Sequence, residues 1–353
     1  MRMSIRFSRI LGAIILGLAL TSVPLVSPAS AEPQGTVTHA VHVTIAPAWF
    51  DPSETAGIIT PFMVLYAVHD ALVKPMPQGL IAPSLAESWS VSKDGRVYEF
   101  VLRKGVTFHN GDPLTAEDVK FSFERYKGAA AKLLKEKVEA VQIVDPHRIR
   151  FHLKEPWPDF MTFYGTPATG AAWIVPKKYV EKVGDDGFKT APIGAGPFKL
   201  VSMTPGVEIT LEAYDKYWRK TPKVKRIVMK SVTEAATRLA MLKRGEVQLA
   251  YMMMGPLGEE VKKDPNLRLE YSGGNAVFWL EFMERNDAKS PWHHPKVRLA
   301  ANYAIDRKAI SEAETLGASP IAGSIIPRHF EYALPELALI FITHNLGIVA
   351  KMC

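Results

Sequence analysis

Residues 85–125 constrain the fold of this chain most strongly, because a strand pair, a turn and a capped helix follow one another there in a fixed order. Asp94 and Gly95 stand between two apolar runs, and an Asp-Gly pair in that position is a hairpin signal. Along the second strand, alternate side chains lie on opposite sides of the sheet. We therefore expect one side, Tyr98, Phe100 and Leu102, to face a core, and the other side to be Val97, Glu99, Val101 and Arg103.

A turn and a helix follow the predicted hairpin. Residues 110–113 read Asn-Gly-Asp-Pro, which is turn chemistry that ends a sheet. Thr115 and Asp118 are three positions apart, as in a capping box, and the apolar residues after them predict a helix over 116–126. These features alone describe a generic α/β module and indicate no ligand.

The whole stretch, LAESWSVSKDGRVYEFVLRKGVTFHNGDPLTAEDVKFSFER, resembles the signature region of family 5 of the bacterial extracellular solute-binding proteins. This family includes the periplasmic oligopeptide-, dipeptide- and nickel-binding proteins, and the resemblance extends over residues 37–335. It implies an α/β, bilobal fold of the type II periplasmic-binding-protein kind, with an incomplete second lobe. It also implies a non-catalytic receptor of an ABC importer, with a small peptide or similar solute and the membrane permease subunits as partners. We expect a monomer without a cofactor.

The first 31 residues have the features of a secretory signal peptide. Three arginines precede an apolar run over 10–20, and an Ala-Ser-Ala cleavage site ends at Ala31. The apolar run is too short to span a bilayer comfortably. We expect cleavage after Ala31 and a periplasmic location. The only cysteine is Cys353, so the expected mature chain is not a lipoprotein and forms no intramolecular disulfide.

The charge balance argues against nucleic acid as a partner. The full chain has 43 basic and 36 acidic residues, for a formal net charge of +7. Removal of the three arginines of the expected leader reduces this excess, and the remaining charges are dispersed. The sequence contains no internal repeat or low-complexity tract, which argues against a solenoid.

Apolar periodicity predicts further elements of a mixed α/β first lobe over 32–253. We expect strands over 37–45, 138–144, 149–153 and 247–251, and helices over 61–72 and 234–244. Thr233 is the expected N-cap of the last helix and Gly245 its end. The apolar stripe of this helix is Ala235, Leu239 and Leu242.

Residues 192–206 resemble the segment that connects the lobes in the family. Gly194 and Gly196 are the expected hinge, because glycine tolerates backbone angles that other residues do not. As a bare G-x-G, they do not indicate a dinucleotide site. The interpretation requires the segments before and after Gly194 to share one sheet.

The second lobe is expected over 254–335. The resemblance implies strands over 267–271 and 276–282, a helix over 295–310 and a loop over 323–335. Residues 336–353 instead resemble the ATPase subunit of the same importer class, in which a histidine that matches His344 contacts the γ-phosphate of ATP. The chain lacks the phosphate-loop pattern G-x-x-x-x-G-K-[ST], so we expect no ATPase activity and infer a gene fusion, deletion or frameshift.

Candidate ligand-binding residues rest on the resemblance alone. In the family, a solute is enclosed between two lobes and its backbone pairs with protein main chain. The positions left on the cleft side are Trp49, Phe50, Asp51, Asn275, Phe278 and Trp279. The aromatic side chains among them are also suited to a core. Residues 252–254 are methionines that resemble adaptable cleft lining, although methionine more commonly fills gaps in a core.

No sequence pattern indicates catalysis or a metal site. His293 and His294 are adjacent, so their side chains diverge, and no cysteine or acidic ligand stands at metal-site spacing. His109 lies in a turn, where relatives hold it structurally. There is no nucleophile elbow and no H-E-x-x-H pattern. The sequence does not distinguish among a peptide, a nickel chelate, a sugar, an opine and glutathione as the solute. The alternative is a truncated or fused fragment that binds no solute.

Overall fold

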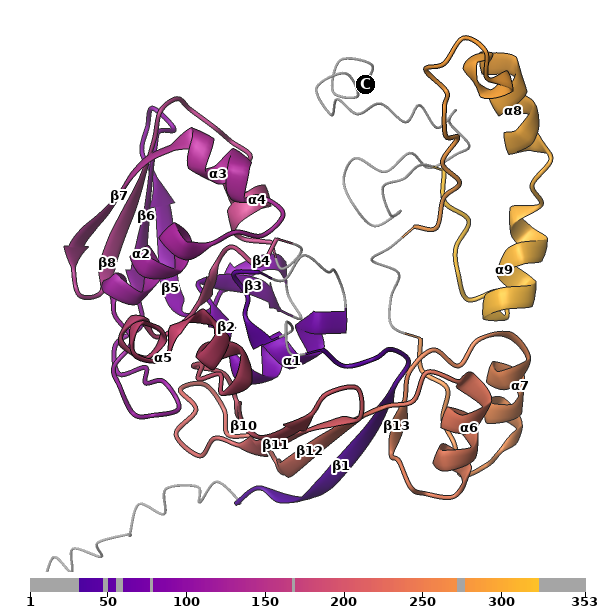
Figure 1. The fold of residues 1–353 in the computed structure, drawn as a ribbon, viewed down its shortest axis with the longest axis horizontal. Coiled ribbons are helices and arrows are strands. Elements are labelled where there is room, and N and C mark those ends of the chain that lie inside the picture. Colours follow the sequence, from indigo (N-terminus) through magenta and orange to yellow (C-terminus); the bar gives the residue numbers. More distant parts are fainter. Residues whose placement is uncertain are drawn as a thin grey trace, which may run out of the picture. The chain divides into compact units, whose positions relative to one another are not determined.

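Two larger sheets organise the computed structural model (Figure 1). The structure describes residues 32–46, 50–54, 60–76, 79–166, 169–271 and 277–323. One sheet has five strands in the order β10-β11-β12-β1-β13, and the other has four in the order β5-β6-β8-β7. The expected leader and the ATPase-like segment 336–353 lie outside the described residues.

The five-stranded sheet contains chain from both sides of Gly194. Its strands are β1 (Gln34–Val41), β10 (Phe198–Thr204), β11 (Glu208–Ala213), β12 (Val224–Ser231) and β13 (Leu249–Ala250). β1 pairs in parallel with β12 and with β13, whereas β10, β11 and β12 are antiparallel neighbours. The shared sheet that the interpretation required is therefore present.

Helix α1 (Thr60–Val68) packs on this sheet through Val64 and Val68, which join Ile209 and Leu211 in one buried cluster. The predicted helix 61–72 is too long. Its last backbone hydrogen bond joins His69 N–H to the Leu65 carbonyl (2.8 Å). The helix ends there because the next residues form β2 (Asp70–Ala71), which pairs with β9 (Trp173–Ile174).

Two predicted strands of the five-stranded sheet have different bounds. β1 begins at Gln34 and ends at Val41, whereas the prediction was 37–45. Residues 34–41 pair with the full length of β12, and the chain bends after Val41. β13 contains only two residues of the predicted 247–251, because only His39 and Ala40 of β1 pair with it.

The four-stranded sheet confirms the predicted hairpin. Its strands are β5 (Ala86–Val91), β6 (Val97–Leu102), β7 (Val138–Asp145) and β8 (Arg148–Leu153). Gly95 takes a φ of +70° in the connecting turn, where glycine is favoured. Side chains on β6 alternate between half-buried and buried, with Tyr98, Phe100 and Leu102 buried as predicted.

The predicted capped helix is α2 (Ala116–Arg125). The backbone N–H of Thr115 donates to Asp118 Oδ2 (2.8 Å), which confirms the capping box. α2 packs on β7 and β8, and α3 (Ala131–Lys137) packs on β7. Phe123 of α2 meets Phe151 edge to face, with ring centroids 5.3 Å apart, inside the larger core.

Shorter elements border this core. β3 (Val73–Met76) and β4 (Gly79–Pro83) form a hairpin, and α4 (Phe160–Tyr164) adds two buried aromatic side chains. α5 (Lys177–Thr190) is interrupted at Gly184, which has a φ of +73°. Val180 and Phe188 of α5 form a smaller cluster with Val175.

The helix predicted over 234–244 is α6 (Ala235–Lys243), and its N-cap is Glu234 rather than Thr233. The Glu234 carboxylate accepts hydrogen bonds from the backbone N–H groups of Ala236 (3.0 Å) and Thr237 (2.5 Å). A carboxylate that reaches two free N–H groups satisfies more of the helix terminus than one hydroxyl does. α7 (Gly255–Lys263) follows β13.

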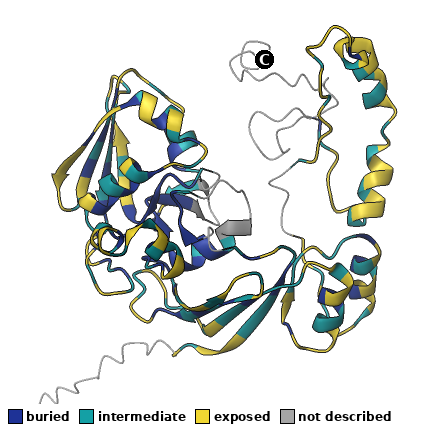
Figure 2. Ribbon diagram, viewed as in Figure 1, coloured by how far each residue is buried: buried dark blue, intermediate teal, exposed yellow. Residues whose placement is uncertain are grey.

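The region after α7 departs most from prediction. The helix predicted over 295–310 is two helices, α8 (Pro295–Tyr303) and α9 (Arg307–Thr315), because Asp306 caps α9 by accepting from Ala309 N–H (2.9 Å). The segment 267–271 and the described part of 276–282 form no strand, since neither pairs with a described strand. No residue of α8 or α9 is buried (Figure 2).

Candidate functional site

The carboxyl edge of three parallel strands is the candidate site. β12, α6 and β13 form a crossover whose strands flank β1, so all three strands end at the same edge of the sheet. In open α/β sheets, ligands bind outside the carboxyl ends of the strands, where connections leave in different directions. The residues that follow the three strands are His42 after β1, Val232 after β12 and Tyr251 after β13.

Arg238 of α6 lies at this edge with 2% of its surface exposed. Its guanidinium donates to the carbonyls of Val232 (2.9 Å), Thr233 (3.0 Å), Tyr251 (2.9 Å) and Met252 (3.2 Å). No carboxylate of the described residues forms an ion pair with it. Burial lowers the pKa of Arg238, but a guanidinium stays charged in proteins. Four carbonyl dipoles and the charge of Glu234 offset the burial of this cation.

Two histidines of β1 and its following bend face Tyr251. The ring of His42 lies 5.0 Å from the Tyr251 ring, and His39 meets the same ring edge to face at 6.5 Å. Burial lowers the pKa of both histidines, and the charge of Arg238 adds to this effect at His42. His42 Nδ1 is buried and has no hydrogen-bond partner among the described residues. The edge therefore favours uncharged imidazoles.

Phe50 and Asp51, both predicted ligand residues, are placed in the protein interior. Phe50 is fully buried in the cluster under α1, and its carbonyl lies 2.8 Å from His69 Nε2. Asp51 is also fully buried and accepts two hydrogen bonds from Arg125 (2.8 and 2.9 Å). Burial favours the neutral acid, but Arg125 outweighs it and lowers the pKa of Asp51. Asp185 completes the site as a second carboxylate on Arg125 (2.7 Å).

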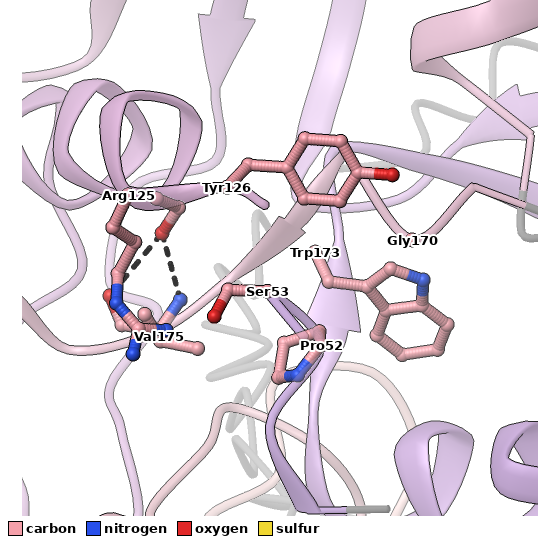
Figure 3. Close-up of a pocket in the computed structure, with 8 residues that line it drawn as sticks. Pro52, Ser53, Arg125, Tyr126, Gly170, Trp173 and Val175 are labelled. Atoms are coloured by element: carbon pink, nitrogen blue, oxygen red, sulfur yellow. Dashed lines mark hydrogen bonds between the residues drawn. The ribbon is translucent and has the colours of Figure 1, made fainter. Parts of the chain in front are cut away.

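The space beside Arg125 is packed rather than hollow. Ser53, Tyr126, Gly170 and Trp173 are among the side chains and backbone that surround it (Figure 3). The gap between them has no room for a water-sized molecule. We therefore assign this cluster to the fold and not to solute binding.

Gly194 and Gly196, the predicted hinge, pack against the end of α1. A Cβ on Gly194 would collide with the Val68 carbonyl, and one on Gly196 would lie 2.6 Å from the Ala67 carbonyl. Neither glycine has a positive φ, so close approach, and not an unusual backbone angle, explains them. His109 holds this segment through both ring nitrogens, to Gly194 N–H (3.3 Å) and the Gly196 carbonyl (2.9 Å). Its predicted structural role is confirmed.

The structure does not bring the other predicted ligand residues together with Phe50 and Asp51. Phe278 and Trp279 are 91% and 57% exposed, whereas Phe50 is fully buried. Trp49 and Asn275 lie outside the described residues. Met252 lies at the carboxyl edge, where its carbonyl accepts from Arg238.

His293 and His294 each make a hydrogen bond within the fold. His293 Nδ1 lies 3.1 Å from the Arg285 carbonyl, and His294 Nδ1 accepts from Lys296 N–H (3.3 Å) at the start of α8. Within the described residues, no group of three or more histidine, cysteine, aspartate and glutamate side chains could hold a metal ion.

No helix of the described residues is long and apolar enough to cross a bilayer.

One open hollow of about 500 Å³ lies on the five-stranded sheet. It is lined mainly by apolar side chains from β1, β10, β12 and β13, together with Met63 of α1. The β12 lining is Val224, Ile227 and Met229, so the hollow extends along the strand to the level of His39 and Leu249. A pocket for a polar solute places several polar groups among apolar ones. Only two residues that line this hollow, His39 and Lys223, are polar.

Comparison with known proteins assigns the family. Residues 81–339 match the family model described as bacterial extracellular solute-binding proteins, family 5 Middle. The chain belongs to family 5 of the bacterial extracellular solute-binding proteins. Members of this family bind solutes and are not enzymes. The match ends four residues beyond the predicted junction at Pro335.

Relatives and solved structures agree with this family. The chain is 31% identical over 289 residues to the glutathione-binding protein GsiB of Salmonella choleraesuis, covering 78% of the chain and 55% of GsiB. It is 30% identical over 324 residues to the probable di/tripeptide-binding protein 5 of Pseudomonas aeruginosa, covering 84% of the chain and 60% of that protein. The chain therefore spans little more than half the length of these relatives.

A solved family structure confirms the predicted α/β fold. The periplasmic binding protein DppA of Helicobacter pylori, in complex with the peptide STSA, superposes with a TM-score of 0.69 at 26% identity. The superposition covers 86% of this chain and 64% of DppA. Its class is the type II periplasmic binding protein, as predicted.

Sequence reasoning missed the buried roles of four charged side chains, Asp51, Asp70, Arg125 and Arg238. Arg125 and Asp51 are 74 positions apart, and no local pattern joins them. Asp70 is fully buried and accepts from Tyr217 (2.9 Å) and Trp218 (2.8 Å), again across a long separation. Arg238 did leave a signal, because it stands within the apolar stripe of α6, three positions after Ala235 and next to Leu239.

Proposed function

We propose that this chain is the solute-binding component of an ABC importer for peptides or related small solutes, acting in the periplasm without catalysis. The family match over 81–339 carries the proposal. The sheet that joins chain from both sides of Gly194 supports it, because such a sheet forms the base of one lobe. Named relatives bind glutathione or di- and tripeptides, so peptide-like solutes are the class to test first.

In the proposed mechanism, a second lobe closes over solute held at the carboxyl edge of β1, β12 and β13. Hinge closure buries the ligand and presents a joined surface to the permease. Trp49, Asn275, Phe278 and Trp279 remain the proposed contacts from the cleft side. Buried Phe50 and Asp51 would act by holding the chain around Trp49 rather than by touching solute.

Titration calorimetry of the purified full chain against glutathione and a set of di- to pentapeptides tests this function. We expect saturable binding to at least one of them. Trp279→Ala should weaken it about tenfold, the loss of roughly 1.4 kcal/mol that one aromatic contact provides. Tyr303→Ala is the matched control, because Tyr303 is an exposed aromatic outside the proposed site. No heat with any solute would contradict the proposal.

The exposed apolar segment supports one alternative. Phe278, Trp279 and Leu280 are consecutive and all exposed, so side chains on both sides of this segment lack a partner in the described structure. A chain in this state does not enclose a solute by itself, and its exposed patch invites aggregation. Calorimetry without heat, together with concentration-dependent light scattering, would favour this non-transporting form.

A further inference from the structure

One stretch of the chain, residues 215–226, concentrates positive charge. It reads DKYWRKTPKVKR and runs from just after β11 into the first residues of β12. Six of the 43 basic residues of the chain lie in it, but only one of its 36 acidic residues. Outside this cationic segment and the expected leader, the charges of the chain are nearly balanced. The positive excess is therefore local, and the expectation that it is dispersed was wrong.

The basic side chains of the cationic segment face solvent. The residue types are lysine and arginine, and all six positions are exposed: Lys216, Arg219, Lys220, Lys223, Lys225 and Arg226. The four lysines and Arg226 form no ion pair with any carboxylate that the structure describes. Their attraction for an anion extends over roughly 8 Å at physiological ionic strength.

Two aromatic side chains hold the start of the cationic segment in place. Tyr217 Oη donates to Asp70 Oδ2 (2.9 Å), and Trp218 Nε1 donates to the same oxygen (2.8 Å). Asp70 is fully buried. The Arg103 guanidinium lies over the Trp218 ring, 5.1 Å from its centroid. Because the backbone here is already fixed, binding through the exposed charges costs little further ordering.

The same contacts argue against a nucleic acid as the partner of the cationic segment. Aromatic residues within a basic run can stack on bases. Here the polar ends of Tyr217 and Trp218 reach the buried Asp70, and Arg103 occupies one face of the Trp218 ring. What remains is positive charge without a stacking platform, which suits a diffuse anionic surface.

The end of the cationic segment lies away from the candidate site. Gln34 N–H donates to the Lys223 carbonyl (2.9 Å), and Gln34 of β1 is level with Val224 of β12. These are the amino ends of two parallel strands, whereas the candidate site is at their carboxyl ends. An anionic surface bound at the amino ends would leave the candidate site free.

We propose that the cationic segment binds the anionic headgroups of a phospholipid membrane surface. This inference rests on the proposed function, because the receptor of an ABC importer works beside the membrane that holds its permease. Each lysine or arginine near an anionic bilayer adds to the attraction, which falls off within a Debye length. The contact is therefore reversible, sensitive to salt and independent of solute.

Co-sedimentation of the full chain with lipid vesicles tests this surface. The probes are vesicles of equal parts phosphatidylglycerol and phosphatidylcholine, and vesicles of phosphatidylcholine alone. At low salt, we expect the mixed vesicles to bind the protein about tenfold more tightly than the neutral ones do. This difference should disappear at high salt, because the charges are then screened.

Variants locate the binding on the chain. Replacement of all four lysines of the cationic segment should weaken binding to mixed vesicles by about tenfold or more; the changes are Lys216→Gln, Lys220→Gln, Lys223→Gln and Lys225→Gln. A matched control makes the same change in net charge at four exposed lysines of α3, α5 and the end of β8, and should bind as wild type does; these changes are Lys132→Gln, Lys154→Gln, Lys178→Gln and Lys182→Gln. If a fourfold variant does not fold, its two twofold halves replace it.

Three results would overturn the inference. They are equal binding to both kinds of vesicle or to neither, an equal loss in the control variant, and tighter binding to single-stranded DNA or polyglutamate than to mixed vesicles. Calorimetry with solute is a separate measurement. Vesicle binding by a chain that binds no solute would leave the membrane surface and remove the proposed function, whereas solute binding without vesicle binding would do the reverse.

Discussion

The four-stranded sheet and the region 277–323 both contain apolar, strand-forming sequence. Only the sheet buries these apolar side chains. Phe100 on β6 is fully buried, with its ring centroid 5.7 Å from that of Phe151 and 6.0 Å from that of Tyr164, whereas Phe278 is 91% exposed. β6 has a partner on each side, β5 and β8. No described strand pairs with 277–282. The difference shows that apolar sequence makes a segment competent to form a strand, and that partners decide whether it does.

The helices of the two regions differ in the same way. α2 buries five residues, including Val119 and Phe123, against β7 and β8. α8 and α9 bury none. Packing of an apolar face supplies most of the stability of a helix in a protein. We therefore expect changes in the first region to alter global unfolding and the same changes in 277–323 to have local effects.

The largest expected contrast comes from removing one phenylalanine in each region. Phe100→Ala should lower the free energy of unfolding by about 3–5 kcal/mol, because it leaves a cavity in a packed core. Phe278→Ala should change it by less than about 0.5 kcal/mol, as for other surface substitutions. Urea unfolding followed by tryptophan fluorescence measures both. Equal losses would show that 277–323 has a core of its own.

The charged pairs of the two regions should also differ. Arg125→Met leaves the fully buried Asp51 carboxylate without its bidentate partner, and should cost about 3 kcal/mol or more. Lys308→Met is the counterpart, because Lys308 and Glu312 lie 3.8 Å apart on the exposed surface of α9. We expect no measurable change for it in the same urea titration. A small effect of Arg125→Met would mean that the Asp51 site is hydrated.

The pH dependence sharpens the contrast further. His69 is fully buried, and burial lowers its pKa to about 4. Between the ordinary histidine pKa near 6.5 and this value, the unfolded chain binds a proton that the folded chain does not, so stability falls as pH falls. The loss is roughly 3 kcal/mol by pH 4.

Urea titrations across this pH range measure the loss. His69→Gln should remove that component of the pH dependence, although it also lowers the stability at pH 7. The same slope in wild type and His69→Gln would contradict a buried, neutral imidazole.

The smallest effect concerns helix caps. Thr115→Ala removes the capping-box residue of α2 and should cost about 1 kcal/mol of global stability. Asp306→Ala removes the carboxylate that caps α9. It should reduce helical circular dichroism slightly without moving the unfolding midpoint. A shift of the midpoint with Asp306→Ala would indicate that α9 unfolds together with the two sheets.

Local signals explain what could be predicted. The turn at Asp94 and Gly95, the alternation along β6 and the Thr115–Asp118 box lie within short stretches of sequence, and the structure confirms all three. The N-cap of α6 was wrong by one residue, because Thr233 and Glu234 both precede the helix and only the contacts distinguish them. The break at Asp306 was missed although aspartate is a strong cap.

Long-range contacts explain what could not be predicted. Nothing near Asp51 indicates that Arg125 binds it, so its burial was not foreseen. The fit of Gly194 and Gly196 against α1 depends on a helix more than a hundred residues earlier. The strands predicted over 267–271 and 276–282 were wrong because sequence shows strand competence without showing a partner.

The central claim is that this family 5 chain has a part with buried cores, built on two sheets, and a part after α7 whose helices α8 and α9 bury no residue. Limited proteolysis with trypsin, followed by mass spectrometry, tests it most directly, because lysine and arginine occur in both parts. The account predicts that the first cuts fall between Arg285 and Lys308, while the Arg148 and Arg150 sites on β8 resist. First cuts within β5 to β8, or equal cutting of both parts, would contradict it.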